Sequence, residues 1–154
     1  MKRHLLAALL LALPASAIPQ EEQVIDWTWS VVATEGRPAG GKRYELQFRG
    51  SIAPGYIVYG SDFQVDIGPR PVRLKFDAPE VTPQGSLRST GTRRRLDPVF
   101  KGEYSYFQGS AQLSQQIAVK EGVSRVTGTL RGQTCREADG TCSLFARRFE
   151  IDLP

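Results

Sequence analysis

The fold is indicated first by the stretch Arg43-Tyr44-Glu45-Leu46-Gln47-Phe48-Arg49, in which apolar and polar residues alternate without interruption. Successive side chains of a β-strand point to opposite faces of a sheet, so a period of two predicts a strand with one buried face. The alternation recurs at 72–77, 125–131 and 145–153, the last interrupted by Arg147. No convincing stretch has the period of 3.6 that an amphipathic helix needs. The chain is therefore predicted to be all-β.

Three further segments, 24–33, 56–63 and 104–119, bring the predicted set to about seven strands, with a bend or bulge expected at Gly109. Strands at this spacing, separated by Gly- and Pro-rich turns, predict an antiparallel β-sandwich, and we expect the immunoglobulin-like type. The segment 78–101 is rich in Pro, Gly, Ser, Thr and Arg. We expect it to be one long loop, either functional or disordered.

The N-terminus has the three parts of a secretory signal peptide. Residues 1–3 supply positive charge, residues 5–13 form an apolar core, and Ala15-Ser16-Ala17 fits a cleavage site. A core of this length is less than half of the ~20 residues that span a bilayer, so no membrane insertion is expected. We therefore predict a signal peptide at 1–17 and one exported domain at 18–154.

The composition excludes several classes of function. The single histidine, His4, lies in the predicted signal peptide, so the mature chain would have none. Histidine-based catalysis and His-ligated zinc are then excluded, and two cysteines are too few for a Cys-only zinc site, so we expect no metal and no cofactor. The chain has 20 basic and 16 acidic residues, and loss of Lys2 and Arg3 brings these numbers close to balance. This charge does not indicate nucleic-acid binding.

Cys135 and Cys142 enclose six residues, and a turn is predicted at Asp139-Gly140. In an oxidising compartment an even number of cysteines normally indicates a disulfide. So short a loop limits the stabilisation to about 2–3 kcal/mol, which a sandwich of this size hardly needs. A loop-borne pair is also what thiol–disulfide exchange requires, because the second cysteine must resolve the mixed disulfide. The spacing alone leaves a structural and a redox role equally open.

Three other patterns give weaker indications. Gly36, Gly41 and Lys42 fit a GxxxxGK phosphate-binding motif, but Arg43 occupies the magnesium-binding position and no helix is predicted to follow. The triplet Arg93-Arg94-Arg95 fits a solvated loop better than a phosphate or acidic-partner site. The scattered carboxylates do not favour a glycosidase.

Four motifs occur in a particular order: Gly55-Tyr56-Ile57-Val58-Tyr59, then Asp97-Pro98-Val99-Phe100, then Tyr106-Phe107-Gln108-Gly109, and last the cysteine pair ahead of a closing strand. Their order and spacing resemble the N-terminal periplasmic domain of the thiol:disulfide interchange protein DsbD, over essentially the whole mature chain. The resemblance implies an immunoglobulin-like sandwich that belongs to a protein-disulfide reductase system. It implies that Cys135 and Cys142 pass electrons from a membrane reductase to thioredoxin-like periplasmic partners, including those of cytochrome c maturation.

The resemblance also implies roles for individual residues. Asp97, Pro98, Val99 and Phe100 would form a cap loop over the disulfide, with Phe100 as the shield. Tyr56 and Tyr59 would line the active site, although Tyr56 fits the sandwich core equally well. The family's membrane and thioredoxin-like domains have no counterpart in this sequence, so we expect a separately encoded membrane electron donor. The alternative is a non-enzymatic exported binding module with a structural disulfide.

Overall fold

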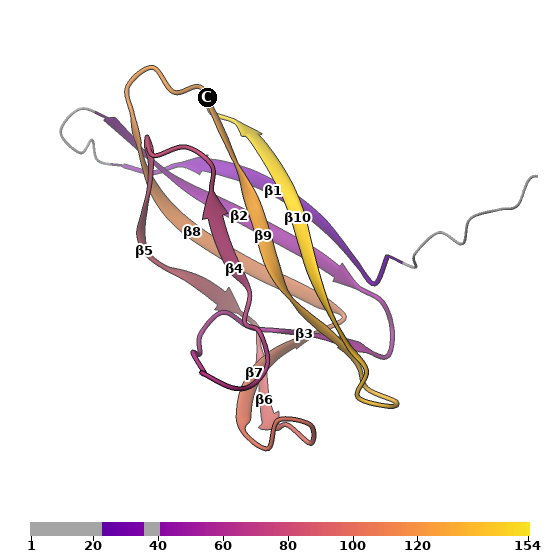
Figure 1. Cartoon of the computed structure of the whole chain (residues 1–154). Coiled ribbons are helices and arrows are strands. Elements are labelled where there is room, and N and C mark those ends of the chain that lie inside the picture. The colour runs from indigo at the N-terminus through magenta and orange to yellow at the C-terminus, as the bar shows by residue number, and fades with distance from the viewer. Residues whose placement is uncertain (1–22, 36–40) are drawn as a thin grey trace, which may run out of the picture.

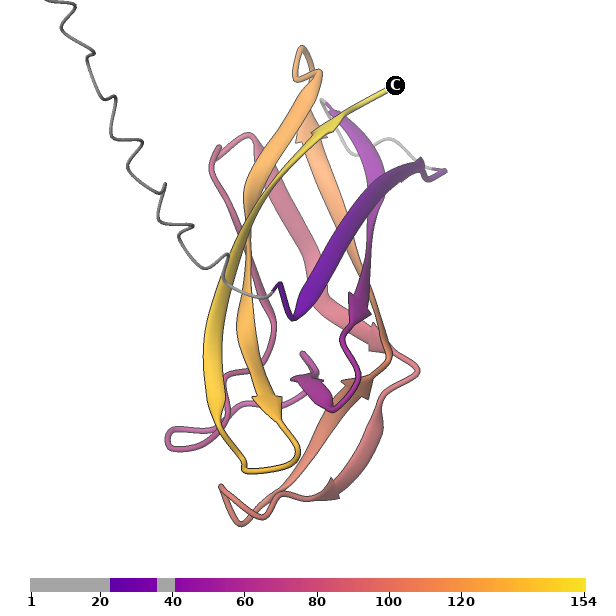
Figure 2. The same cartoon turned by 90° about the vertical axis from the view of Figure 1, so that its right-hand side faces the viewer.

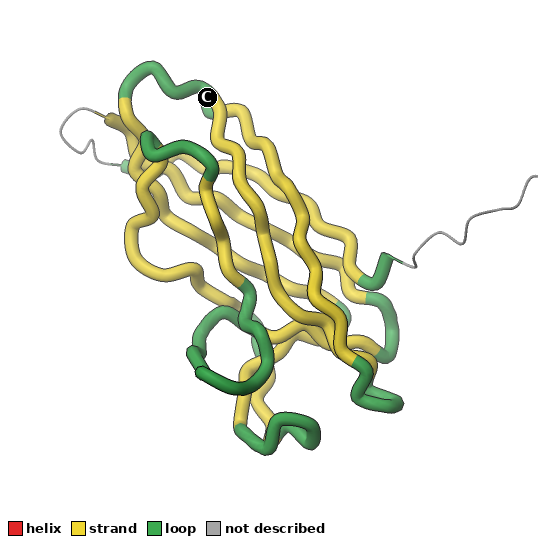
Figure 3. The backbone as a smooth tube through the Cα atoms, in the orientation of Figure 1, coloured by secondary structure: helices red, strands yellow, loops and turns green. Residues whose placement is uncertain are grey.

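The computed structural model describes residues 23–35 and 41–154, and within them it contains strands, turns and loops but no α-helix (Figures 1 and 3). The predicted signal peptide and Gly36 of the GxxxxGK motif lie outside the described residues. None of the described segments is a helix long and apolar enough to cross a membrane. The strands are β1 (Ile25–Ala33), β2 (Gly41–Ile52), β3 (Tyr56–Tyr59), β4 (Arg73–Phe76), β5 (Val81–Thr90), β6 (Arg93–Leu96), β7 (Glu103–Gln108), β8 (Ser110–Lys120), β9 (Arg125–Arg136) and β10 (Cys142–Asp152).

The described strands pair antiparallel and form two facing layers (Figure 2). One layer has the order β1-β2-β8-β5, and the other contains β10, β9 and β4. At one end β3 lies between β9 and β7, and β6 pairs with β7. The chain turns from β7 into β8 at Gly109, whose φ of 75° is favourable for glycine. The predicted sandwich and the predicted bend at Gly109 are both confirmed.

The main core lies between the layers and comes from the alternation that predicted the strands. In β2, Tyr44, Leu46 and Phe48 are at most 3% exposed. They pack with inward-facing residues of the opposite layer, among them Leu130 of β9 and Phe149 of β10, and the rings of Phe48 and Phe149 meet edge to face at 5.1 Å. At about 25 cal/mol for each Å² of apolar surface buried, this cluster is the main stabilising element of the fold.

The prediction of one long loop at 78–101 is wrong, because this segment contains β5 and β6. Among the described strands, β5 pairs only with β8 and β6 only with β7. Most of their exposed side chains are polar, and no continuous apolar alternation marks them. In β5 the register also shifts between Gln84 and Arg88, next to Gly85 with a φ of 72°. The predicted strand 56–63 is also shorter than expected, since β3 ends at Tyr59.

A second, smaller apolar cluster lies on the outer face of the layer that contains β3 and β9. It consists of Ile57, Tyr59, Tyr104, Tyr106 and Cys135, with Phe63, Val65, Phe100 and Cys142 packed against it. The loop 60–72 contributes Phe63 and Val65 to this cluster. Arg73 holds the loop in place by donating hydrogen bonds to the carbonyls of Ser61 at 2.8 Å and Phe63 at 2.7 Å. Burial lowers the pKa of the Arg73 guanidinium.

Candidate functional site

The hairpin of β9 and β10 brings the two cysteines together. Cys135 lies directly opposite Cys142 in the strand register, their Cα atoms are 4.0 Å apart, and they form a disulfide. The predicted turn follows, with Gly140 at a φ of 70° and its N–H donating to the Arg136 carbonyl at 2.9 Å. The Asp139 carboxylate accepts a hydrogen bond from the Thr141 N–H at 3.0 Å, and this bond lowers the pKa of Asp139. The sequence therefore predicted both the pairing and the turn.

The two cysteines differ in their access to solvent. Cys135 is 4% exposed and belongs to the second cluster, whereas Cys142 is half-buried at its edge. A reagent that approaches from solvent therefore meets Cys142 first.

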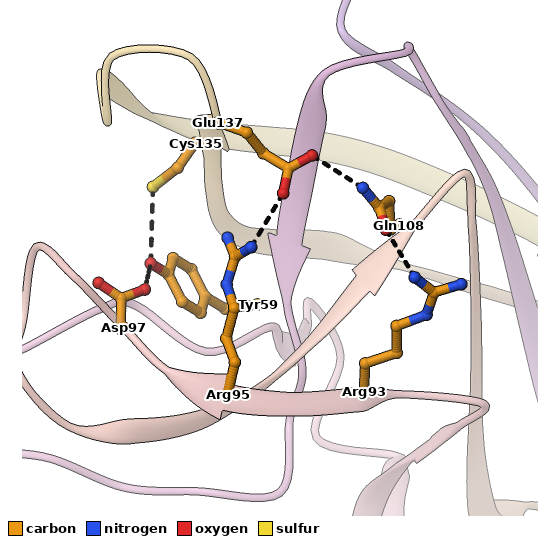
Figure 4. A network of polar contacts seen from close by, with 7 residues as sticks. All are labelled: Tyr59, Arg93, Arg95, Asp97, Gln108, Cys135 and Glu137. Carbon is orange, nitrogen blue, oxygen red and sulfur yellow. Dashed lines mark hydrogen bonds and ion pairs between the residues drawn. The ribbon is translucent and has the colours of Figure 1, made fainter.

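Tyr59 connects the buried cysteine to a buried carboxylate (Figure 4). Its hydroxyl oxygen lies 3.8 Å from Cys135 Sγ, and the hydroxyl donates a short hydrogen bond to Asp97 Oδ2. Burial raises the pKa of Tyr59 well above its ordinary value, and the hydrogen bond to Asp97 and the charge of Asp97 raise it further. The phenol is therefore neutral throughout the physiological pH range and keeps its proton for Asp97.

Asp97 organises the turn that follows β6. Although it is only 3% exposed, its carboxylate is satisfied, because Oδ1 accepts hydrogen bonds from the N–H groups of Val99 at 2.8 Å and Phe100 at 3.0 Å. Its own N–H donates to the Gly102 carbonyl at 2.7 Å. Asp side chains commonly stabilise turns by accepting from the backbone two or three residues on. Lys101 completes the turn with a φ of 57°.

The turn lies against both the second cluster and the cysteine hairpin. Phe100 is half-buried, and its ring meets that of Tyr59 at 6.2 Å and 74°. Val99 is 47% exposed, and its Cγ2 lies so near Gly140 that a Cβ added there would be 3.0 Å away. Pro98 is exposed. Of the four predicted cap residues, Phe100 therefore packs against the cluster that contains Cys135, and Val99 lies near the cysteine hairpin at Gly140.

Tyr56 is the predicted site residue that the structure does not bring to the cysteines. It packs against the main core, because it lies on the opposite face of β3 from Tyr59. Ile57, rather than Tyr56, packs beside Tyr59 and Cys135 in the second cluster, and it was not predicted as a site residue. Its separation of two residues from Tyr59 is the pattern that could have identified it. Tyr104 and Tyr106 were missed as site residues as well, although they share the same spacing.

A polar network borders the cluster and corrects the interpretation of the arginine triplet as a solvated loop. Arg93-Arg94-Arg95 lies in β6, and Arg95 Nη1 forms an ion pair with Glu137 Oε1 at 2.9 Å. The guanidinium of Arg95 also stacks 4.5 Å from the centre of the Tyr106 ring. Within residues 23–35 and 41–154, no three His, Cys, Asp or Glu side chains are placed to hold a metal ion.

One family model and several solved structures are similar to this chain. The family model described as "Thiol:disulfide interchange protein DsbD, N-terminal" matches residues 19–153. The reduced N-terminal domain of Neisseria meningitidis DsbD aligns with a TM-score of 0.55 and 21% identity, over 85% of this chain and 86% of that chain. The N-terminal periplasmic domain of ScsB from Proteus mirabilis aligns with a TM-score of 0.50 and 10% identity, over 83% of this chain and 45% of that chain. No curated protein matches the chain. At these identities the structural matches establish the fold, and they agree with the predicted immunoglobulin-like sandwich.

Proposed function

Because the chain belongs to the family of DsbD N-terminal domains, we propose that it exchanges thiols and disulfides with partner proteins through Cys135 and Cys142. The observation that carries the proposal is the disulfide between these residues, half-buried at the edge of an aromatic cluster outside the main core. A disulfide needed only for stability would be expected to join the two sheets. This one instead closes a single hairpin, where its contribution to stability is small.

The exchange takes place in two steps that conserve electrons and protons. A thiolate of the electron donor attacks one sulfur of the Cys135–Cys142 disulfide, which forms a mixed disulfide and releases the other cysteine. The second thiol of the donor then resolves the mixed disulfide, so the donor leaves oxidised and the domain holds two thiols. Reduction of an acceptor's disulfide follows the same steps in reverse, and the domain returns to its disulfide form. No cofactor is needed, because sulfur carries both electrons.

Cys142 is the sulfur that meets the partner, and Cys135 is the resolving cysteine. Their difference in exposure supports this assignment, since attack requires an approach along the S–S axis to an accessible sulfur. The Tyr59 hydroxyl lies against the sulfur of Cys135, and its hydrogen bond to Asp97 holds the ring in that position.

The segment Asp97-Pro98-Val99-Phe100 acts as the cap. Phe100 packs against the cluster that contains Cys135, and Val99 packs against the cysteine hairpin at Gly140. The cap hinders small thiols and moves aside when a partner docks.

The partners are thioredoxin-like periplasmic proteins as acceptors and a separately encoded membrane protein as donor. The family name, thiol:disulfide interchange, supports this chemistry. Export follows from the predicted signal peptide, with cleavage after Ala17.

A redox titration tests the proposal. The disulfide is equilibrated with glutathione buffers, and its oxidation state is read by alkylation and mass. Structural disulfides of secreted proteins typically have potentials below about −300 mV, so an exchanging pair is expected above that value. The reduced domain should also reduce a thioredoxin-like protein, while the Cys135→Ser/Cys142→Ser variant should not. A potential below about −300 mV without transfer would instead indicate a binding module with a structural disulfide.

A further inference from the structure

We propose that Arg95 and Glu137 are positioning residues of the exchange site. Their ion pair holds the strand that carries the cap against the cysteine hairpin, and thereby sets how often the disulfide is open to an incoming thiol. The inference rests on the proposed function, since it takes Cys135–Cys142 as the reacting group.

The ion pair joins two segments that are not paired with each other as strands. Arg95 lies in β6, directly before the cap, and the described strand pairings connect β6 to β7 alone. Glu137 lies in the cysteine hairpin, two residues after Cys135. The contact between Arg95 Nη1 and Glu137 Oε1, at 2.9 Å, therefore links the base of the cap to the hairpin across 42 residues of sequence. Cap opening that swings β6 away must break this contact.

Both residues also make contacts besides the ion pair, and Figure 4 shows the one between Gln108 and Glu137. The guanidinium of Arg95 stacks on Tyr106, which is 8% exposed. The second carboxylate oxygen of Glu137 accepts from Gln108 Nε2 at 2.8 Å, and its main-chain N–H donates to the Gly55 carbonyl at 2.8 Å. An ion pair between side chains already ordered by other contacts loses little rotamer entropy when it forms.

The pair is also better shielded from solvent than comparable pairs on this protein. The difference lies in the arginine: Arg95 is 35% exposed and Arg88, which pairs with Glu45 at 3.2 Å, is 64% exposed. The carboxylates are similar, with Glu137 27% and Glu45 22% exposed. Salt screens a partly buried pair less than an exposed one. From the usual strength of such pairs and of cation–π stacking, loss of the Arg95 contacts should raise the population of open cap about three- to tenfold.

The test measures reduction of the native disulfide by dithiothreitol in Arg95→Met, Glu137→Gln and the double variant. We expect Arg95→Met, which removes both the ion pair and the stacking on Tyr106, to be reduced about three- to tenfold faster than wild type, and Glu137→Gln, which removes the ion pair alone, about two- to fivefold faster. The double variant should resemble Arg95→Met, because both substitutions remove the same ion pair. The matched control is Arg88→Met, which breaks an ion pair between β5 and β2 and should be reduced at the wild-type rate. Glu137→Gln preserves side-chain shape and decides the outcome if Arg95→Met folds poorly.

The sign of the two effects separates a positioning role from a direct charge effect on the incoming thiolate. If the charges only attracted or repelled the thiolate, Arg95→Met would slow reduction and Glu137→Gln would accelerate it. Opposite signs, additive effects, or changes no larger than that of Arg88→Met would overturn the proposal. Steep acceleration by low urea would do so as well, since it would mean that the reduction proceeds through global unfolding rather than local opening.

The same proteins distinguish this inference from the proposed function. Dithiothreitol reports only the access to the disulfide, whereas electron transfer to a thioredoxin-like protein reports the exchange function. Same-sign acceleration without any transfer would refute the exchange function and leave the positioning role in place.

Discussion

Replacing Asp97 by alanine should open the cap and expose the disulfide. The substitution removes the acceptor of three hydrogen bonds, from the hydroxyl of Tyr59 and from the main-chain N–H groups of Val99 and Phe100. These contacts connect the turn to the aromatic cluster, so their loss acts where Phe100 packs against the cluster that contains Cys135.

The magnitude of the effect follows from the burial of each donor. The Tyr59 hydroxyl is in a side chain only 1% exposed, and a buried donor left without a partner costs about 1–3 kcal/mol. The two N–H groups lie in a more exposed turn and regain water, so they add about 1 kcal/mol together. We therefore expect Asp97→Ala to lower the free energy of unfolding by about 3 kcal/mol. Asp97→Asn retains one acceptor oxygen for the N–H groups and should lose about 1–2 kcal/mol.

Two measurements on the same variants check this reasoning. Urea unfolding gives the stability, and the rate of disulfide reduction by dithiothreitol in the native state gives the access to the site. Asp97→Ala should be reduced at least about tenfold faster than wild type, with Asp97→Asn between the two, since about 1.4 kcal/mol of cap opening corresponds to a factor of ten. An alanine variant within about 0.5 kcal/mol of wild type and reduced at the wild-type rate would refute the assigned role of Asp97.

Four further predictions follow from the site and the sequence. The Cys135→Ser/Cys142→Ser variant should fold with a loss of about 2–3 kcal/mol in urea unfolding and show no exchange, whereas failure to fold would mean that the disulfide is a structural staple. Phe100→Ala should speed reduction by dithiothreitol severalfold and cost about 1–2 kcal/mol, because the ring is half-buried; a loss of about 3–5 kcal/mol without faster reduction would make it a core residue. Because the folded-state pKa of Tyr59 is raised, its contribution to stability is complete below the unfolded value of about 10 and is lost as the pH rises toward the folded value. Above pH of about 10 wild type should therefore lose stability more steeply than Tyr59→Phe, and equal slopes in urea unfolding would contradict this. Intact-mass analysis of exported protein should find Ile18 at the N-terminus, and a membrane-bound product that retains the first seventeen residues would contradict the predicted cleavage.

The strands that could be predicted from the sequence are those with one apolar face against the main core. In β2 the alternation around Leu46 and Phe48 identifies both the strand and its buried side. β5 and β6 could not be identified in this way, because their polar residues become strands through pairing with β8 and β7 rather than through burial of a regular apolar face. The pairing of β5 with β8 joins segments distant in sequence, and β6 has no apolar alternation that would mark its pairing with the neighbouring β7.

The site likewise contains residues that the sequence predicted and residues that it did not. The cysteine pair and its turn are local motifs, and both were found at their predicted positions. Tyr56 was assigned to the site because the resemblance covered the whole motif, while the choice of face depends on the register of β3 between β7 and β9. The contact of Arg95 with Glu137 joins residues 42 apart, so no spacing in the sequence indicates it.

The placement of core and site on opposite faces of β3 has a consequence for divergence and for redesign. The odd-numbered residues of this strand, Ile57 and Tyr59, belong to the second cluster with Cys135. The even-numbered residues, Tyr56 and Val58, pack in or against the main core. Substitutions at the odd positions can therefore retune reactivity without opening a cavity in the main core, although they lose the contacts of the second cluster, and substitutions at the even positions can adapt thermal tolerance without touching the cysteines. A library randomised at 57 and 59 alone would search for new partner preferences while the main core stays as it is.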